Sequence, residues 1–76
     1  MKIDKAALQW QCRRGMLELD VLLERYLQQF DALTELEQQQ FAALLAHSDQ
    51  DLFDWLLGKS EATDPILAAT VAKIRN

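Results

Sequence analysis

MLELDVLLERYLQQFDAL, residues 16–33, is the stretch that decides the fold of this 76-residue chain. Its apolar side chains recur at spacings of three and four residues, so an α-helix would carry them on one wide face. These side chains are those of Leu19, Leu22, Leu23, Tyr26, Leu27, Phe30 and Leu33. We therefore expect a helix from Met16 to about Leu33 that packs this face against the rest of the domain.

A second helix-forming segment precedes this stretch. It runs from about Asp4 to Arg13, and Asp4 has the side chain of an N-cap residue. Arg13 and Arg14 would suit the negative end of the dipole of this helix. Gly15 would then follow its C-terminus, where a glycine in the left-handed conformation is common.

Three further helices are expected after residue 33. Their expected bounds are Thr34 to His47, Ser48 or Asp49 to Gly58, and Asp64 onward. Thr34 and Glu37 have the spacing of a capping box, which marks the start of the first of them. Asp64 is an N-cap candidate for the last, because Pro65 then occupies the favoured first helical position.

The composition supports the same fold class. Half of the residues are hydrophobic, and the chain contains only two Gly and one Pro. Leu, Ala, Gln and Glu dominate, and all four are good helix formers. A chain of this length accommodates one domain. We predict an all-α fold, a compact single-domain five-helix bundle that comprises residues 1–76.

The net charge of −4 is unevenly distributed along the chain. Residues 1–14 carry four cations, including Lys2, and one acid, whereas residues 15–76 carry four cations and eleven acids. Because an acidic surface repels phosphate groups, we expect no nucleic-acid partner. No segment approaches the ~20 apolar residues that span a bilayer, and no signal-peptide core is present. We expect a complete soluble cytoplasmic protein that does not insert into a membrane.

Few residues are candidates for enzyme chemistry. Cys12 is the only cysteine, which fits a reducing compartment, and His47 is the only histidine. The neighbouring Arg13 and Arg14 could lower the pKa of Cys12 and make it reactive. The simpler interpretation, which we favour, is that Cys12 is a small apolar side chain on the inner face of the first helix. His47 near a helix C-terminus needs no special role.

Three carboxylates, those of Asp49, Asp51 and Asp54, lie close together in the segment SDQDLFD. This segment lacks the central glycine and the closing glutamate of a calcium loop. Asp49 and Asp51 are explained by the first turn of a helix, where acids are favourable. Asp54 lies further along, beside Trp55. Both Trp55 and Trp10 are predicted to be core or half-buried residues, although tryptophan also anchors interfaces.

The stretch RRGMLE, residues 13–18, places a glycine between cations and a carboxylate. Each residue suits a helix–helix corner. Arg14 and Glu18 would be exposed charges whose pairing contributes roughly 0–1 kcal/mol, so we expect little loss of stability when either is replaced. Gly15 lacks a side chain and allows another backbone to come close. Together these residues would form a small, flat, polar docking site.

The string from Arg14 to Glu18, RGMLE, matches the Arg-Gly-x-x-Glu motif of the succinate dehydrogenase assembly factors, small FAD assembly factors also called flavinators. The resemblance covers essentially the whole chain. It includes the residues WQCRRGM that lead into the motif, the segment DQDLFDWL and the ending Ile74-Arg75-Asn76. The motif alone is a weak pattern, but together with the matching length, helix order and second segment it is specific.

The resemblance implies a five-helix bundle and an accessory protein rather than an enzyme. Such a protein promotes covalent attachment of FAD to a histidine of the flavoprotein subunit of succinate dehydrogenase, and of fumarate reductase in many bacteria. The partner would handle the FAD, and this chain would bind no cofactor or metal stably. It would be a monomer when free, in a bacterial cytoplasm. The expected partner-binding residues are Arg14, Gly15, Met16 and Glu18, with Arg13, Asp20, Asp54 and Trp55.

Two alternatives stay open at this point. The chain could be a generic helical adaptor or regulator that uses the same surface on an unrelated target. It could also be a small thiol-dependent enzyme or redox sensor that uses Cys12. The assembly-factor hypothesis requires Arg14, Gly15 and Glu18 and tolerates loss of Cys12, whereas the thiol hypothesis requires the reverse.

Overall fold

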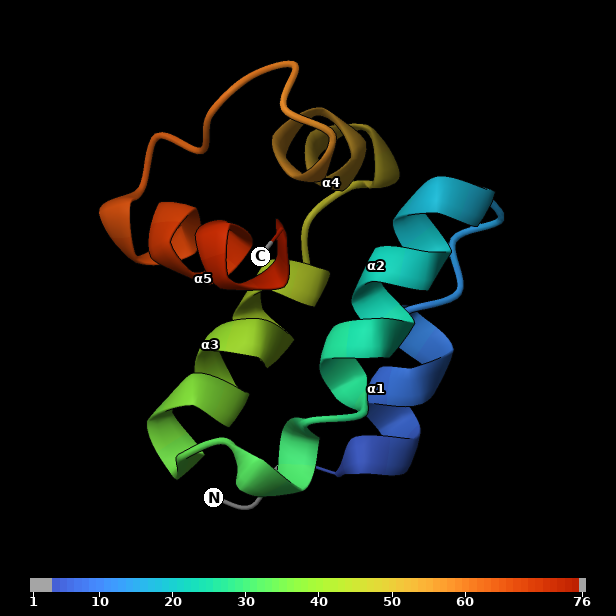
Figure 1. Cartoon of the computed structure of the whole chain (residues 1–76), viewed down its shortest axis with the longest axis vertical. Coiled ribbons are helices and arrows are strands. Elements are labelled where there is room, and N and C mark those ends of the chain that lie inside the picture. Colours follow the sequence, from blue (N-terminus) through green and yellow to red (C-terminus); the bar gives the residue numbers. More distant parts are fainter. Residues whose placement is uncertain (1–3, 76) are drawn as a thin grey trace.

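The computed structural model describes residues 4–75 and contains five α-helices and one short 3₁₀ helix over that range (Figure 1). The helices are α1 (Lys5–Gln11), α2 (Leu17–Leu27), α3 (Glu35–Leu45), α4 (Asp49–Leu56) and α5 (Pro65–Arg75), with the 3₁₀ helix η1 (Phe30–Ala32) between α2 and α3. The predicted all-α five-helix bundle is confirmed. Lys2 and Asn76, which the sequence analysis used, lie outside the described residues.

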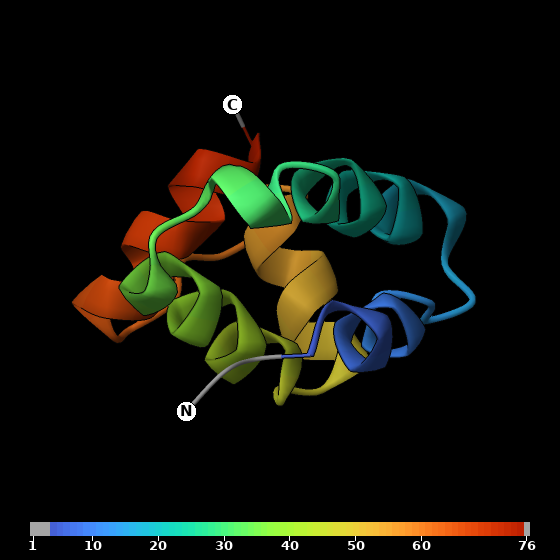
Figure 2. The same cartoon turned by 90° about the horizontal axis from the view of Figure 1, so that it is seen from below.

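The helices form two packed pairs that contact each other, and the fifth helix packs against both. Helices α1 and α2 run in opposite directions side by side, and α3 packs against α5 (Figure 1). Helix α4 lies across one end, between the two pairs, where it contacts α2 and α5 (Figure 2). This arrangement brings the α1–α2 connection next to the junction between α3 and α4.

Helix starts follow the capping residues that the sequence predicts. Asp4, Thr34 and Ser48 are the N-caps of α1, α3 and α4, and each side chain accepts a backbone N–H of the first turn. Thr34 and Glu37 form both hydrogen bonds of the capping box. The carboxylate of Asp64 accepts the N–H of Ile66 at 2.8 Å at the start of α5.

The predicted single helix from Met16 to Leu33 is wrong at its C-terminal end. Helix α2 ends at Leu27, and η1 follows after a turn. The side-chain amide of Gln38 donates to the carbonyl of Phe30 at 2.9 Å, which stabilises the break. Residues three apart share a side of a 3₁₀ helix, so the apolar spacing continues through the break and conceals it.

The core is one cluster of side chains from all five helices and η1. It consists of Leu8, Cys12, Leu19, Leu23, Tyr26, Leu27, Phe30, Phe41, Leu44, Leu45, Leu52, Leu56, Val71 and Ile74. The rings of Tyr26 and Phe41 meet edge to face, with 5.0 Å between centroids. Trp55 is half-buried, as predicted, but Trp10 is not: 77% of its surface is exposed, because α1 turns Leu8 and Cys12 inward instead.

Among the described residues, no helix is both long and apolar enough to cross a bilayer. The longest helices contain 11 residues, whereas a helix needs about 20 to cross the hydrocarbon core.

Candidate functional site

The connection between α1 and α2, residues 12–16, carries the motif glycine, and we call it the motif loop. Helix α1 ends at Gln11 with Cys12 as its C-cap, so Arg13 and Arg14 lie in the loop and not in the last helical turn as expected. Gly15 has a φ of +78°, the left-handed conformation that the sequence predicts. It adopts this conformation in the middle of the loop rather than directly after the C-cap.

Space around Gly15 is open on the outer side of the loop. A Cβ atom added to Gly15 would meet no heavy atom within 4 Å. The fold therefore requires glycine here only for its backbone conformation, since side chains rarely adopt a positive φ. The free space lies on the solvent side, where a second molecule can approach the backbone.

The backbone of the motif loop is held by Asp20, which lies one turn into α2. Its Oδ1 accepts the N–H of Arg14 at 2.8 Å, and its Oδ2 accepts the N–H of Gly15 at 3.2 Å. A single carboxylate thus satisfies two successive amides. Asp20 was expected to bind a partner, and the structure gives it a role in shaping the loop.

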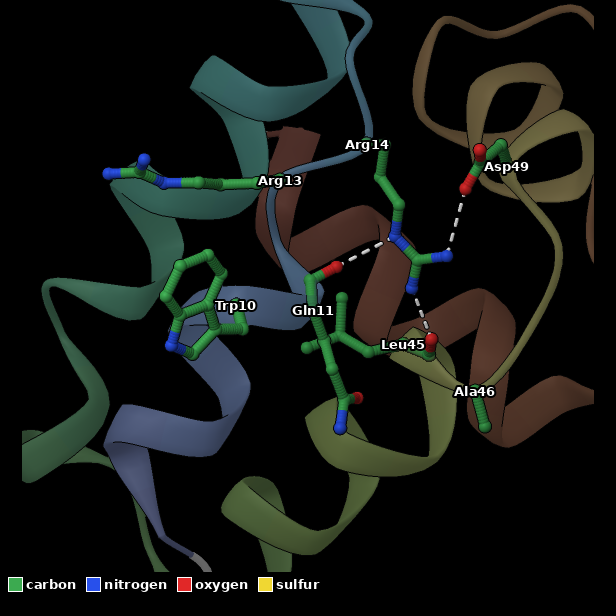
Figure 3. Close-up of a pocket in the computed structure, with 7 residues that line it drawn as sticks. All are labelled: Trp10, Gln11, Arg13, Arg14, Leu45, Ala46 and Asp49. Carbon is green, nitrogen blue, oxygen red and sulfur yellow. Dashed lines mark hydrogen bonds and ion pairs between the residues drawn. The ribbon is translucent and has the colours of Figure 1, made fainter.

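The side chain of Arg14 crosses from the motif loop to the α3–α4 junction (Figure 3). Its Nε donates to the carbonyl of Gln11 at 2.7 Å, and one terminal nitrogen donates to the carbonyl of Leu45. The other terminal nitrogen, Nη1, lies 2.9 Å from Oδ1 of Asp49 and 3.3 Å from the carbonyl of His47. The Arg14 side chain is only 16% exposed. The expectation that Arg14 is a surface charge near Glu18 is therefore wrong.

The remaining motif residues differ in exposure. Glu18 is exposed and makes no ion pair or hydrogen bond through its carboxylate within the described part of the chain. Met16 is partly buried against the core. Arg13 points away from Arg14 (Figure 3). Its Nε lies 3.5 Å from Oε1 of Glu24. Both partners of this pair are well exposed, so it contributes little to stability.

Helix α4 contributes Asp54 and Trp55, the other two expected site residues. The carboxylate of Asp54 accepts a hydrogen bond from the side-chain amide of Gln50 at 2.9 Å. Its backbone carbonyl accepts hydrogen bonds from the N–H groups of Lys59 and Ser60, in the loop after α4. The ring of Trp55 meets the ring of His47 edge to face at 5.1 Å. Since the His47 carbonyl accepts from Arg14, His47 links Trp55 to the motif loop, whereas Asp54 has no such link among these contacts.

Asp49 is the site residue that sequence reasoning missed. It was explained as a helix-start acid, yet Ser48 already caps α4 by accepting the N–H of Asp51 at 3.1 Å. The Asp49 carboxylate is therefore free to pair with Arg14. The sequence indicated a role for Asp49 only through its position in the segment DQDLFDWL. Nothing in the sequence shows which cation forms an ion pair with it.

A shallow groove runs beside the motif loop. It is lined by Trp10, Gln11, Arg13, Arg14, Leu45, Ala46 and Asp49 (Figure 3). Within residues 4–75, no group of three or more His, Cys, Asp or Glu side chains is arranged to hold a metal ion.

Cys12 lacks the properties of a reactive thiol. Its side chain is fully buried, as predicted. Burial, with the nearby charge of Glu24, raises its pKa to about 12, and the opposing charge of Arg14 does not compensate. At neutral pH the group is a protonated thiol, which is neither a nucleophile nor a metal ligand.

Comparison with known proteins supports the resemblance seen in the sequence. A family model described as "Flavinator of succinate dehydrogenase" matches residues 6–76. The FAD assembly factor SdhE of Vibrio cholerae is 51% identical over 71 residues, which is 92% of this chain and 83% of the relative. The FAD assembly factor SdhE of Mannheimia succiniciproducens is 49% identical over 69 residues, 90% of this chain and 80% of the relative.

A relative with a lower identity gives a similar result. The FAD assembly factor SdhE of Legionella pneumophila strain Paris is 45% identical over 74 residues, 96% of this chain and 92% of the relative. These matches confirm the predicted family and identify an accessory protein rather than an enzyme. With its five-helix fold and its match over residues 6–76, the chain belongs to the family of flavinators of succinate dehydrogenase.

Proposed function

We propose that this chain binds the flavoprotein subunit of succinate dehydrogenase and promotes the covalent attachment of FAD to it. Membership of the flavinator family and the names of the relatives support a role in FAD assembly. Fumarate reductase is a second proposed partner, because the family resemblance implies covalent attachment of FAD to its flavoprotein subunit as well. The chain acts as a monomer in the bacterial cytoplasm, without a nucleic-acid partner.

The observation that carries the docking part of this proposal is the open face formed by Gly15 and Glu18. Gly15 presents bare backbone toward free space, and Glu18 presents a carboxylate without a partner in residues 4–75. A flavoprotein backbone can approach Gly15 closely, and a cation or N–H group of that protein can pair with Glu18. Met16 and Arg13 of the motif loop flank this face, and Arg14 and Asp20 support it from within. Asp54 and Trp55 of α4 stay proposed partner-binding residues outside this face.

The proposed mechanism requires no cofactor bound stably to this chain. The bond to FAD forms within the partner, from the reactivity of the flavin and the partner's histidine. The chain accelerates the step by binding the competent conformation of the partner more tightly than other conformations. Its effect cannot exceed this difference in affinity.

Co-expression with a succinate dehydrogenase flavoprotein subunit, in cells without the endogenous factor, tests the proposal. Covalent flavin is read as fluorescence of the denatured subunit on a gel. We expect a strong loss with Gly15→Arg and a clear loss with Glu18→Ala. Gly58→Ala and Glu61→Ala are matched controls, since Gly58 has nearly the same φ of +79° and Glu61 is an exposed acid outside the motif.

Wild-type covalent flavin with both motif variants, each shown to be folded by circular dichroism, would reject this face as the docking site. A pull-down of the tagged wild-type protein addresses the alternative of a generic adaptor. Recovery of an unrelated protein, without any flavoprotein subunit, would favour that alternative.

A further inference from the structure

The position of the motif loop is fixed from two sides. Asp20 of α2 holds the backbone amides of Arg14 and Gly15, and the α3–α4 junction holds the Arg14 side chain. We infer that Asp49 is a positioning residue. It orders the open face formed by Gly15 and Glu18, the docking face, by holding Arg14, and it does not itself contact the flavoprotein. This inference rests on the proposed function.

Arg14 has little capacity left to bind a partner. A guanidinium has five N–H donors. Four interactions already occupy it, with the carbonyls of Gln11, Leu45 and His47 and the carboxylate of Asp49. Its side chain is also 16% exposed, whereas the carboxylate side chain of Asp49 is 52% exposed. Arg14 therefore supports the docking face through contacts within the fold rather than through contacts with the partner.

The α3–α4 junction is a favourable place for a cation, because negative charge gathers there. Helix α3 ends at Leu45, so the carbonyl of Leu45 lies at the negative end of the helix dipole. Asp49 adds a full negative charge at the first residue of α4. Arg14 lies between these groups. The carbonyl acceptors belong to the backbone, so Asp49 is the only one of the four acceptors that a substitution can remove.

Loss of Asp49 should loosen the loop without unfolding the domain. The guanidinium would keep its carbonyl acceptors but lose its only charged one, and charge-assisted hydrogen bonds are the stronger ones. Gly15 and Glu18 would then sample more conformations. The flavoprotein would have to order them on binding, and this lowers affinity.

Asp49→Ala tests the inference, and Asp51→Ala is its matched control. Asp51 is an exposed acid in the same helical turn, and its carboxylate has no contact with Arg14 among the interactions of the described residues. Affinity for the purified flavoprotein subunit is measured below the melting range of every variant. We expect about tenfold weaker binding for Asp49→Ala, equivalent to about 1.4 kcal/mol, and no change for Asp51→Ala.

Two further measurements separate positioning from direct contact and from general stability. In the Arg14→Ala background, Asp49→Ala should cause no additional loss of affinity, because the two residues act as one unit. The ¹⁵N order parameter of the Gly15 amide should fall in Asp49→Ala toward ~0.6, while that of the Phe41 amide stays near the rigid value of ~0.85. A merely structural role would not change Gly15 selectively.

Full affinity of Asp49→Ala, additive losses in the double variant, or an unchanged Gly15 order parameter would each overturn the inference. The affinity of the Gly15→Arg variant is measured as well, because it tests the proposed function. If Gly15→Arg keeps full affinity, the docking face is wrong. The order parameter still decides whether Asp49 orders the loop.

Discussion

Nη1 of Arg14 lies 2.9 Å from Oδ1 of Asp49, across 35 residues of sequence. This ion pair joins the two stretches on which the family resemblance rests, RGMLE and DQDLFDWL. The motif thus divides into residues of two kinds. Arg14 is bound within the fold, whereas Gly15 and Glu18 face solvent.

Arg14→Ala should destabilise the domain, and Glu18→Ala should not. Removal of the guanidinium leaves partly buried carbonyls and Asp49 without their donor, at a cost of about 1–3 kcal/mol. Glu18 is exposed and has no such contacts, so its replacement should stay within about 0.5 kcal/mol. Thermal unfolding checks this, since 1 kcal/mol shifts the Tm of a domain this size by about 4–8 °C. Equal Tm values would mean that Arg14 is not held as described.

Gly15→Ala should lower the free energy of unfolding by about 1–2 kcal/mol, because alanine is strained at positive φ. Gly15→Arg should cost little more than Gly15→Ala, since the space beyond the Cβ position is open. Gly58→Ala is the stability control. Its Cβ would lie 3.0 Å from Nη2 of Arg75, the end of a flexible side chain that can move away.

Urea denaturation of these glycine variants gives the comparison. A much larger loss for Gly15→Arg than for Gly15→Ala would show that the fold, and not only a partner, fills the space beside Gly15.

Cys12→Ala should preserve flavinylation of the partner and lower stability by about 1 kcal/mol, a usual value for a single substitution. The thiol is fully buried and its pKa is raised to about 12, so it supplies no nucleophile. Alkylation by iodoacetamide should be slow in the native protein and rapid in urea. Rapid native alkylation, or loss of covalent flavin in a folded variant, would revive the thiol hypothesis.

Glu37 should make stability depend on pH in the acid range. The N–H of Thr34, then the side chains of Lys73 and Thr34, lower the pKa of Glu37 below its usual 4.5 in the folded state. A depressed folded pKa means that the stabilisation is complete above the unfolded pKa and is lost as pH falls through the folded one.

Glu37→Gln keeps an oxygen acceptor for the capping box but removes this charge. Urea midpoints of the wild type and Glu37→Gln should differ at pH 7 and converge as the pH falls below 4.5 and through the lowered pKa of Glu37. A constant difference between pH 7 and pH 3 would contradict the assigned interactions.

Much of the local structure follows from neighbouring residues alone. Thr34 with Glu37, Ser48, and Asp64 with Pro65 mark helix starts, because a cap satisfies backbone donors only two or three residues away. The left-handed glycine of the motif loop is local in the same sense. The family, too, is recognisable from sequence, since RGMLE and DQDLFDWL are linear patterns.

Other features depend on residues far apart in the chain. The 3₁₀ helix that follows the end of α2 is held by Gln38 of α3, and the exposure of Trp10 depends on which face of α1 meets the core. The partner of Arg14 was decided by the packing of α4 across the bundle, which brings Asp49 to the motif loop. An arginine can pair with any acid within reach, and only the tertiary structure selects Asp49 over the nearby Glu18.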